Sequence, residues 1–495
     1  MTDNPQSQNL DGAGNDKPEQ GELSPRYGEK APHTSMPLPA KTSAKVNAST
    51  ERGLGNTPRG SSAPIVAIVG RANVGKSSLF NTVLGRREAI IADEPGTTRD
   101  SVTARSSWGG KDFWLVDTAG LKEAADDFEL TIQDQIAQAA ASADIILVVA
   151  EADVPPTQED RKIAKMALKS KKPVILAVNK IDKNHRSKLE EWRTLGIKLI
   201  LTTSTTQKTG ISELLDKVTE NLPPARIRQD SDRVRVAILG RPNVGKSAIF
   251  NTLARKQQAI VADKAGTTRD VNRAVVRYDG KEIELMDTAG IRRPGKIERG
   301  VEHFSVLRSL AAIEQADVAL LLMDANELNV QLDQKIAGLV KEAGKGLILV
   351  VSKWDAINKD AYTRDSLAPQ VAYNFVFVPW APLIFTSAVT GQNVTKIFEL
   401  VTEIVLERSR TFKTTELNRW LRQSVDQHPP AGLKGRTPKL NYIVQESETG
   451  LPSFKVFGAH TKFLHWSYKR YLERKFRENW PLTGTPLKFW FIEKH

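Results

Sequence analysis

Three short motifs recur in the same order and at a constant spacing along the 495-residue chain. Residues 67–77 read AIVGRANVGKS, and residues 237–247 read AILGRPNVGKS. GTTRD at 96–100 and DTAG at 117–120 also return, each 170 residues further on. A single period this long indicates a duplicated domain rather than a short solenoid repeat. The chain must therefore accommodate two copies of one domain.

Each copy alternates short apolar runs with helical stretches. In the first copy the apolar runs cover residues 66–69, 113–116, 145–149 and 174–178. Buried strands that alternate with helices are typical of an α/β fold, with a mostly parallel sheet and helices on both faces. We expect two such domains, at 64–224 and 233–408, joined by a charged linker at 225–232.

The two ends of the chain differ in composition from the repeats. Residues 1–63 are rich in Gly, Pro, Ser, Asn and Thr and lack apolar periodicity, so we expect a disordered tail. Residues 409–495 are aromatic and basic, and they predict a small α+β domain. Its expected elements are a helix at 416–427, strands at 439–445 and 453–458, a helix at 463–479 and a last strand at 487–492.

The net charge of +13 is concentrated near the carboxyl end. Residues 407–495 hold 17 Lys and Arg against 8 Asp and Glu, whereas residues 1–63 hold 7 of each sign. A basic module suggests a polyanion such as RNA, although a solvated surface without a partner would carry the same charge. The absence of cysteine and of long apolar stretches predicts a cytoplasmic protein that does not bind membranes.

Each copy begins with a phosphate-binding loop. The pattern Gly-x-x-x-x-Gly-Lys-Ser follows an apolar strand and precedes a helix, which is the context that such a loop requires. Backbone N–H groups then face the phosphates, the lysine reaches the β- and γ-phosphates, and the serine hydroxyl binds Mg²⁺. The expected binding residues are Gly70, Asn73, Val74, Gly75, Lys76, Ser77 and Ser78, and in the second copy Gly240, Asn243, Val244, Gly245, Lys246, Ser247 and Ala248.

The other two motifs supply the remaining groups of a nucleoside-triphosphate site. The aspartate of each DTAG ends an apolar strand, where a carboxylate would position Mg²⁺. The second threonine of each GTTRD would add an oxygen ligand to that ion. The glycine of each DTAG would sense the γ-phosphate. The residues expected to act in catalysis are Lys76, Thr98, Gly120, Lys246, Thr268 and Gly290. Those expected to hold Mg²⁺ are Ser77, Thr98, Asp117, Ser247, Thr268 and Asp287.

Two further loops decide which base is bound. Asn179-Lys180-Ile181-Asp182 follows an apolar strand, and its carboxylate can accept two N–H bonds from guanine but not from adenine. The second copy reads Ser352-Lys353-Trp354-Asp355 and keeps the carboxylate. Ser204, Ser387 and Ala388 lie where a backbone N–H group would contact the guanine O6. We therefore expect GTP or GDP in both sites.

These motifs resemble those of the Der (EngA) family of tandem bacterial GTPases. The resemblance covers about residues 64–495, and it includes residues 466–477 with Gly484-Thr485-Pro486, which are similar to the family's KH-like domain. It implies GTP hydrolysis, with a nucleotide state that controls binding to the immature large ribosomal subunit and its RNA during ribosome biogenesis. We expect a monomer. A GTPase of tRNA modification is disfavoured, because such relatives have one GTPase domain and a terminal catalytic cysteine.

The second copy departs from the family at Ser352, where the family has asparagine. The substitution is expected to remove an amide that ties the base loop to the phosphate loop. The second domain is then expected to bind GTP more weakly or less selectively than the first. An alternative is a second domain that senses nucleotide without turnover, and another is a GTPase with a different RNA partner.

Hydrolysis itself is expected to be slow without help. Leu121 and Ile291 follow DTAG, at the position where Ras-type GTPases carry a water-orienting glutamine. Asn73 and Asn243 match the asparagine that helps hold K⁺ in potassium-activated relatives, so we expect K⁺ stimulation. Asparagine is also a common turn residue, which would explain both positions without an ion.

The basic residues of the C-terminal domain predict contact with RNA phosphates. Lys469, Arg470 and Arg474 lie on one expected helix. Aromatic residues alternate with them at helical spacing, which indicates a core rather than a platform for bases; they are Trp466, Tyr468, Tyr471 and Phe476.

Overall fold

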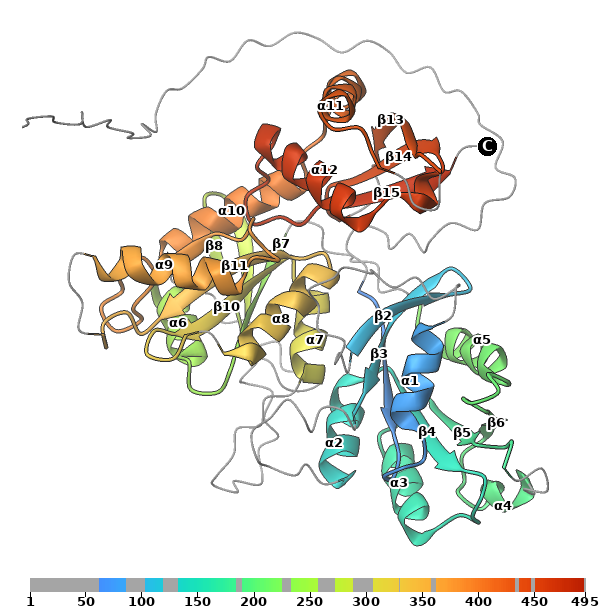
Figure 1. Ribbon diagram of the computed structural model, residues 1–495. Helices are drawn as coiled ribbons and strands as arrows, with labels where there is room; N and C mark the ends of the chain where they lie inside the picture. The colour runs from blue at the N-terminus through green and yellow to red at the C-terminus, as the bar shows by residue number, and fades with distance from the viewer. Residues whose placement is uncertain are drawn as a thin grey trace, which may run out of the picture. The chain divides into compact units, whose positions relative to one another are not determined.

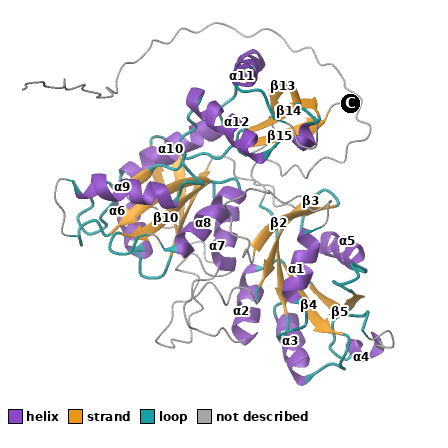
Figure 2. Ribbon diagram, in the orientation of Figure 1, coloured by secondary structure: helices purple, strands orange, loops and turns teal. Residues whose placement is uncertain are grey.

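The structure is a computed structural model of the chain. It describes residues 62–85, 103–118, 132–183, 189–224, 233–256, 272–287, 306–328, 330–357, 362–431, 436–446 and 450–493. These residues form two six-stranded sheets and one three-stranded sheet, each packed with helices (Figures 1 and 2). The expected linker and all but the last two residues of the expected tail lie outside them. Within the described parts of the chain, every helix is too short or too polar to span a membrane.

The first domain is an α/β fold with one antiparallel edge strand. Its sheet has the order β2-β3-β1-β4-β5-β6, in which only β2 runs against its neighbour. The elements are β1 (Ile65–Val69), α1 (Lys76–Leu84), β2 (Thr103–Trp108), β3 (Lys111–Asp117), α2 (Ile132–Ser142), β4 (Ile145–Glu151), α3 (Gln158–Lys169), β5 (Val174–Asn179), α4 (Leu189–Arg193), β6 (Leu199–Thr202) and α5 (Ile211–Asn221).

The second domain repeats this arrangement. Its sheet has the order β12-β11-β10-β7-β9-β8, again with one antiparallel pair at the edge. The elements are β7 (Arg233–Gly240), α6 (Lys246–Lys256), β8 (Asn272–Tyr278), β9 (Lys281–Asp287), α7 (Val306–Gln315), β10 (Val318–Asp324), α8 (Gln331–Glu342), β11 (Gly346–Ser352), α9 (Thr363–Asn374), β12 (Leu383–Phe385) and α10 (Lys396–Arg408). The predicted duplication of a mostly parallel sheet is confirmed.

Each parallel sheet separates two apolar cores, because successive side chains of a strand point to opposite faces. In β1, Val66 and Ile68 pack with α1 and α5, while Ala67 and Val69 pack with α2 and α3. This explains why the strands read as continuous apolar runs. All five residues of β1 are buried.

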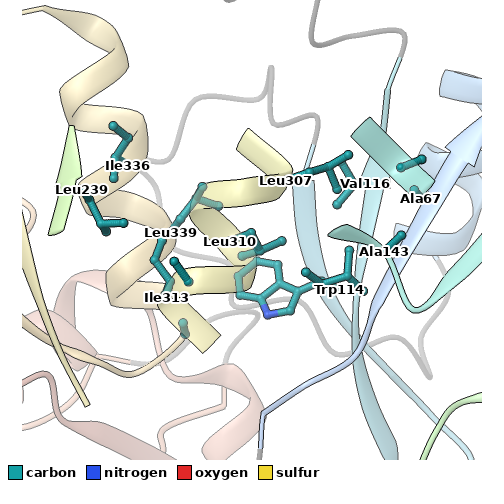
Figure 3. Close-up of a cluster of buried hydrophobic side chains, with 14 of the residues drawn as sticks. Ala67, Trp114, Val116, Ala143, Leu239, Leu307, Leu310, Ile313, Ile336 and Leu339 are labelled. Atoms are coloured by element: carbon teal, nitrogen blue, oxygen red, sulfur yellow. The ribbon is translucent and has the colours of Figure 1, made fainter. Parts of the chain in front are cut away.

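One of these cores continues from the first domain into the second. Figure 3 shows Leu307, Leu310 and Ile313 of α7 between Trp114 on one side and Leu339 on the other. At its edge the buried Trp114 Nε1 donates to Glu314 Oε1 at 2.6 Å, and the backbone N–H of residue 63 donates to Oε2 at 2.9 Å. The carboxylate thus satisfies two buried donors across the contact between the two domains.

The C-terminal domain has a three-stranded sheet in the order β13-β14-β15. Its elements are α11 (Thr414–Gln427), β13 (Lys439–Gln445), β14 (Ser453–Ala459), α12 (Trp466–Asn479) and β15 (Lys488–Glu493). The predicted order of elements is confirmed, but the second helix begins at Trp466 rather than at Phe463. A short 3₁₀ turn occupies Thr461–Phe463, and the His465 ring accepts from the Ser467 N–H group, which caps the helix at that point.

The C-terminal domain is tied to the second α/β domain through its Gly484 turn. Leu347 N donates to Gly484 O at 2.9 Å, and Gly484 N donates to Trp380 O at 2.7 Å. Gly484 has a φ of +61°, and a Cβ there would lie 2.2 Å from Ile404 Cδ1. Only glycine fits this turn, because a side chain would be both strained and in collision with α10.

Candidate nucleotide-binding sites

The first phosphate loop joins β1 to α1 and depends on two glycines. Gly70 approaches β4 so closely that a Cβ would lie 2.4 Å from Val149 O. Gly75 has a φ of +96°, and its Cβ would lie 2.4 Å from Asn179 Nδ2. Gly75 also precedes the first turn of α1, so the free N–H groups of the helix point into the loop. The backbone is therefore shaped to hold an anion.

Lys76 and Ser77 place a cation and a hydroxyl at this loop. Lys76 is buried, and its Nζ donates to Gly70 O at 2.9 Å and to Arg71 O at 2.7 Å. Ser77 Oγ donates to Asp117 Oδ2 at 2.5 Å, which brings the ends of α1 and β3 together. Hydroxyl and carboxylate oxygens are ligands that Mg²⁺ prefers, so this donor set fits a magnesium nucleotide.

The base loop of the first domain is tied to the phosphate loop. Asn179 Nδ2 donates to Val74 O at 3.0 Å, and Lys180 Nζ donates to Asn73 O at 2.7 Å. Ser204 Oγ donates to Asp182 Oδ1 at 2.5 Å, which orients the carboxylate expected to read guanine. The predicted residues of the first base site are therefore brought together.

An acidic residue links the two loops of the first site. Glu151, at the end of β4, pairs with Lys180 at 2.7 Å and with Arg71 at 3.4 Å. The hydrogen bond from Lys180 lowers the pKa of Glu151, so this carboxylate stays ionised at neutral pH.

The second site repeats the phosphate loop. Lys246 Nζ donates to Gly240 O at 3.0 Å and also to Arg241 O, and Ser247 Oγ donates to Asp287 Oδ2 at 3.1 Å. A Cβ at Gly240 would lie 2.5 Å from Leu322 O on the neighbouring strand. The two phosphate loops therefore share one geometry.

In the second base loop, Lys353 pairs with Asp324 at 2.7 Å. Burial opposes ionisation of Asp324, but the hydrogen bonds from Lys353 and Asn326 outweigh it and lower the pKa.

The other predicted residues lie as follows. Asp355 is exposed, Ser387 Oγ accepts from Thr390 N, and Ala388 O accepts from a threonine of α6. Ser78 and Ala248 are exposed on the first turns of α1 and α6.

The expectation that Ser352 breaks the tie to the phosphate loop is wrong. Ser352 Oγ lies 2.6 Å from Val244 O, the counterpart of the carbonyl that Asn179 contacts, and 3.0 Å from Met323 O. The hydroxyl reaches this carbonyl because Ser352 ends β11 directly beside the loop. The substitution instead leaves space, since a Cβ at Gly245 would meet nothing within 4 Å.

Sequence reasoning missed an arginine in each phosphate loop. Arg71 Nε lies 3.5 Å from Asp160 Oδ1, and Arg241 pairs with Asp333 at 3.2 Å and with Glu327 at 2.8 Å. Both aspartates are buried in the first turn of the helix that follows β4 or β10. Two signals were available in the sequence. Both copies have arginine directly after the first glycine of the phosphate loop, and the two aspartates are 173 residues apart, which is also the spacing between the two base loops.

Several predicted residues lie outside the described part of the chain. They are the switch residues Thr98 and Thr268, the γ-phosphate sensors Gly120 and Gly290, and the hydrophobic residues Leu121 and Ile291. Their roles stay predictions.

Family models match all three domains. Residues 65–180 and 235–353 each match the model of the 50S ribosome-binding GTPases. Residues 411–491 match the model of the KH-domain-like C-terminal region of EngA bacterial GTPase enzymes. The matched ranges fall on the two α/β domains and on the three-stranded domain.

Individual relatives match most of the chain. GTPase Der of Chloroflexus aggregans is 45% identical over 434 residues, which covers 86% of this chain and 96% of the relative. GTPase Der of Agathobacter rectalis is 40% identical over 432 residues, which covers 86% of this chain and 98% of the relative. Among solved structures, the G domain of the T. maritima FeoB iron transporter is 26% identical with a TM-score of 0.25, covering 34% of this chain and 98% of that chain.

The buried Asp333 predicts a pH-dependent stability. Burial raises the pKa of Asp333 from 3.8 to about 6, although Arg241 opposes the rise. Between these values the folded chain holds more protons on Asp333 than the unfolded chain, so this contribution to stability falls as pH rises and is constant above about pH 6. Asp333→Asn removes this titration. As pH rises from 3.8 to about 6, the free energy of unfolding of the wild type should fall by on the order of 2–3 kcal/mol relative to that of the variant.

The measurement is the thermal midpoint of both proteins from pH 4.5 to 7.5. The difference between them should change below pH 6 and stay level above it. A difference that is constant over the whole range would contradict the raised pKa.

Proposed function

The chain belongs to the Der (EngA) family of GTPases, and from that premise we propose that nucleotide in its two sites controls binding to the immature large ribosomal subunit. The observation that carries the proposal is the duplicated loop geometry. In each copy the lysine contacts loop carbonyls, the serine hydroxyl contacts the strand-end aspartate, and the base loop contacts the phosphate loop. The basic KH-like domain supports an RNA partner.

The residues of each loop have defined parts in hydrolysis. Lys76 and Lys246 cap loop carbonyls, and both can turn toward the β- and γ-phosphates, where their charge offsets charge that develops during transfer. Ser77 and Ser247 would hold Mg²⁺, which neutralises phosphate charge when bound, and Asp117 and Asp287 orient these hydroxyls. The switch threonines are proposed to complete the ion's shell.

The test is GTP hydrolysis by the full chain with Lys76→Ala or Lys246→Ala, with and without purified large subunits. Removing either lysine should lower the rate of its own site on the order of 100-fold. Large subunits should stimulate the wild type. Lys217→Ala is the matched control, because this lysine lies on the exposed face of α5 and pairs only with Glu220 among the contacts described.

Other results would select the alternatives. If GTP hydrolysis is lost with Lys76→Ala but not with Lys246→Ala, the second domain is a nucleotide-sensing module without turnover. Indifference to ribosomal particles would leave a GTPase with a different RNA partner and would contradict the proposed control of subunit binding.

We also propose that the second site binds guanine nucleotide more weakly than the first. An asparagine amide has two N–H donors, and Asn179 uses one on Val74 O, so the other can reach the base. A serine hydroxyl has a single proton, and Ser352 directs it to Val244 O or Met323 O. The space beside Gly245 marks where the missing amide would lie.

Ser352→Asn should therefore raise the GDP affinity of the second site about tenfold, since one hydrogen bond is gained without a clash. Asn179→Ser is the reciprocal change and should weaken the first site by a similar factor. Each site can be measured by calorimetric titration, with the other phosphate-loop lysine replaced by alanine. Unchanged affinity in both variants would contradict the proposed role of the second donor.

We further propose that K⁺ stimulates hydrolysis through Asn73 and Asn243, and that intrinsic turnover is slow. Both asparagines have a left-handed backbone, with φ of 64° and 63°, and both are exposed at the loop. An exposed amide oxygen there is available to a monovalent cation beside the phosphates. The rate should be higher in KCl than in NaCl, and Asn73→Ala with Asn243→Ala should remove the difference. Equal rates in both salts would leave these residues with a turn-forming role only.

A further inference from the structure

The three-stranded sheet of the C-terminal domain has two different faces. One face carries Ile443, Phe454 and Val456, which pack with α11 and α12 in a single apolar core. Figure 1 shows both helices to one side of this sheet. The alternate residues point the other way, because side chains alternate along a strand. The structure therefore leaves a second face that these helices do not cover.

This second face carries five aromatic or aliphatic side chains and one lysine, whereas the solvent face of a sheet that is covered on one side is usually polar. Strand pairing sets its side chains in two rows. One row is Tyr442, Phe457 and Ile492, and the other is Val444, Lys455 and Trp490. All six are partly exposed, and none belongs to the core formed with α11 and α12 among the described residues. We call these six residues the outer sheet face.

Three rings of the outer sheet face are held in place by their neighbours. Tyr442 and Phe457 stack with centroids 4.6 Å apart and planes inclined by 13°. Trp490 Nε1 donates to the buried Ser453 Oγ at 3.0 Å, which fixes the indole on the sheet. A fixed ring loses little side-chain freedom when a flat ligand stacks on it.

Cations lie beside one of these rings and near the end of the sheet. Lys488 Nζ lies 4.0 Å from the Trp490 ring centroid, and Lys455 lies in the same row as that ring. At the end of the sheet, Arg436 and Lys462 lie 5.3 and 5.6 Å from the Phe463 ring. Glu446 and Glu493 pair with cations of the same region and partly offset the charge. The domain as a whole stays basic, with 17 Lys and Arg against 8 Asp and Glu over residues 407–495.

From these observations we propose that the outer sheet face is a stacking platform for single-stranded RNA, an inference that rests on the RNA-binding role proposed above. Aromatic rings on an open sheet stack unpaired bases, and flanking lysines contact the phosphates. A duplex keeps its bases stacked inside and offers only its backbone to such a surface. The partner is therefore an unpaired segment, not a helix, of the RNA.

This assignment differs from the expectation drawn from helical spacing. Tyr468, Tyr471 and Phe476 of α12 are buried, as that spacing predicted. Trp466 is 43% exposed, with Arg470 4.7 Å from its ring. It lies on the helical side of the domain, which makes it a matched control: an exposed aromatic ring with a cation beside it, but not on the outer sheet face.

The experiment measures binding of a fluorescent mixed-sequence 12-nucleotide single-stranded RNA to the full chain by anisotropy. A hairpin duplex of the same composition is the second probe. Trp490→Ala and Tyr442→Ala should each weaken single-strand binding on the order of tenfold, because one stacked base is lost. Trp490→Phe keeps a ring and should retain most of the affinity. Trp466→Ala should bind like the wild type.

The outcomes separate this proposal from the proposed function. Unchanged GTP hydrolysis in each variant will show that loss of binding is not loss of fold. If Trp490→Ala and Tyr442→Ala bind the single strand like the wild type, or if the duplex binds as tightly, the platform is overturned. Cosedimentation with large subunits tests the proposed function separately. The chain can bind subunits even if the outer sheet face binds no RNA, and the outer sheet face can bind the oligonucleotide even if the chain does not bind subunits.

Discussion

Both nucleotide sites depend on the close approach of a phosphate loop to the neighbouring parallel strand. Gly70 meets Val149 O and Gly240 meets Leu322 O at distances that no side chain allows. This approach turns the loop back over the start of α1 or α6, so the buried lysine can reach loop carbonyls that would otherwise face away. The serine, the strand-end aspartate and the base loop then converge on the same edge of the sheet, where the carboxyl ends of parallel strands meet.

The two sites share this backbone but differ in how their loops are connected. In the first, Glu151 contacts both Arg71 and Lys180, so one carboxylate joins the phosphate loop to the base loop. In the second, the corresponding contacts separate: Arg241 pairs with Glu327 and Asp333, while Lys353 pairs with Asp324. In the first site one carboxylate therefore contacts both loops, whereas in the second the ion pairs are separate and the Ser352 hydroxyl joins the base loop to the phosphate loop. The two copies thus share the geometry of the phosphate loop and differ in the ion pairs around it.

The three domains differ in how they use the two faces on which the side chains of a strand alternate. The parallel sheets bury both faces between helices, which produces two cores per domain and leaves function to the strand ends. The C-terminal sheet buries one face against α11 and α12 and keeps the other partly open. In that domain, function is therefore proposed for a face of the sheet rather than for its edge.

The repeated motifs were enough to predict the duplication, the strand-ending aspartates and the glycine-lysine-serine loops, because these features are local and their spacing is set by single strands and turns. The sequence also predicted nearly all helices and strands of the C-terminal domain. Three other features became visible only in the folded chain: Arg71 meets Asp160, the Ser352 hydroxyl reaches Val244 O, and Tyr442, Phe457 and Trp490 share one face. Such contacts join residues far apart in the chain, and they follow from which strands are neighbours and in what register they pair, which no local pattern specifies.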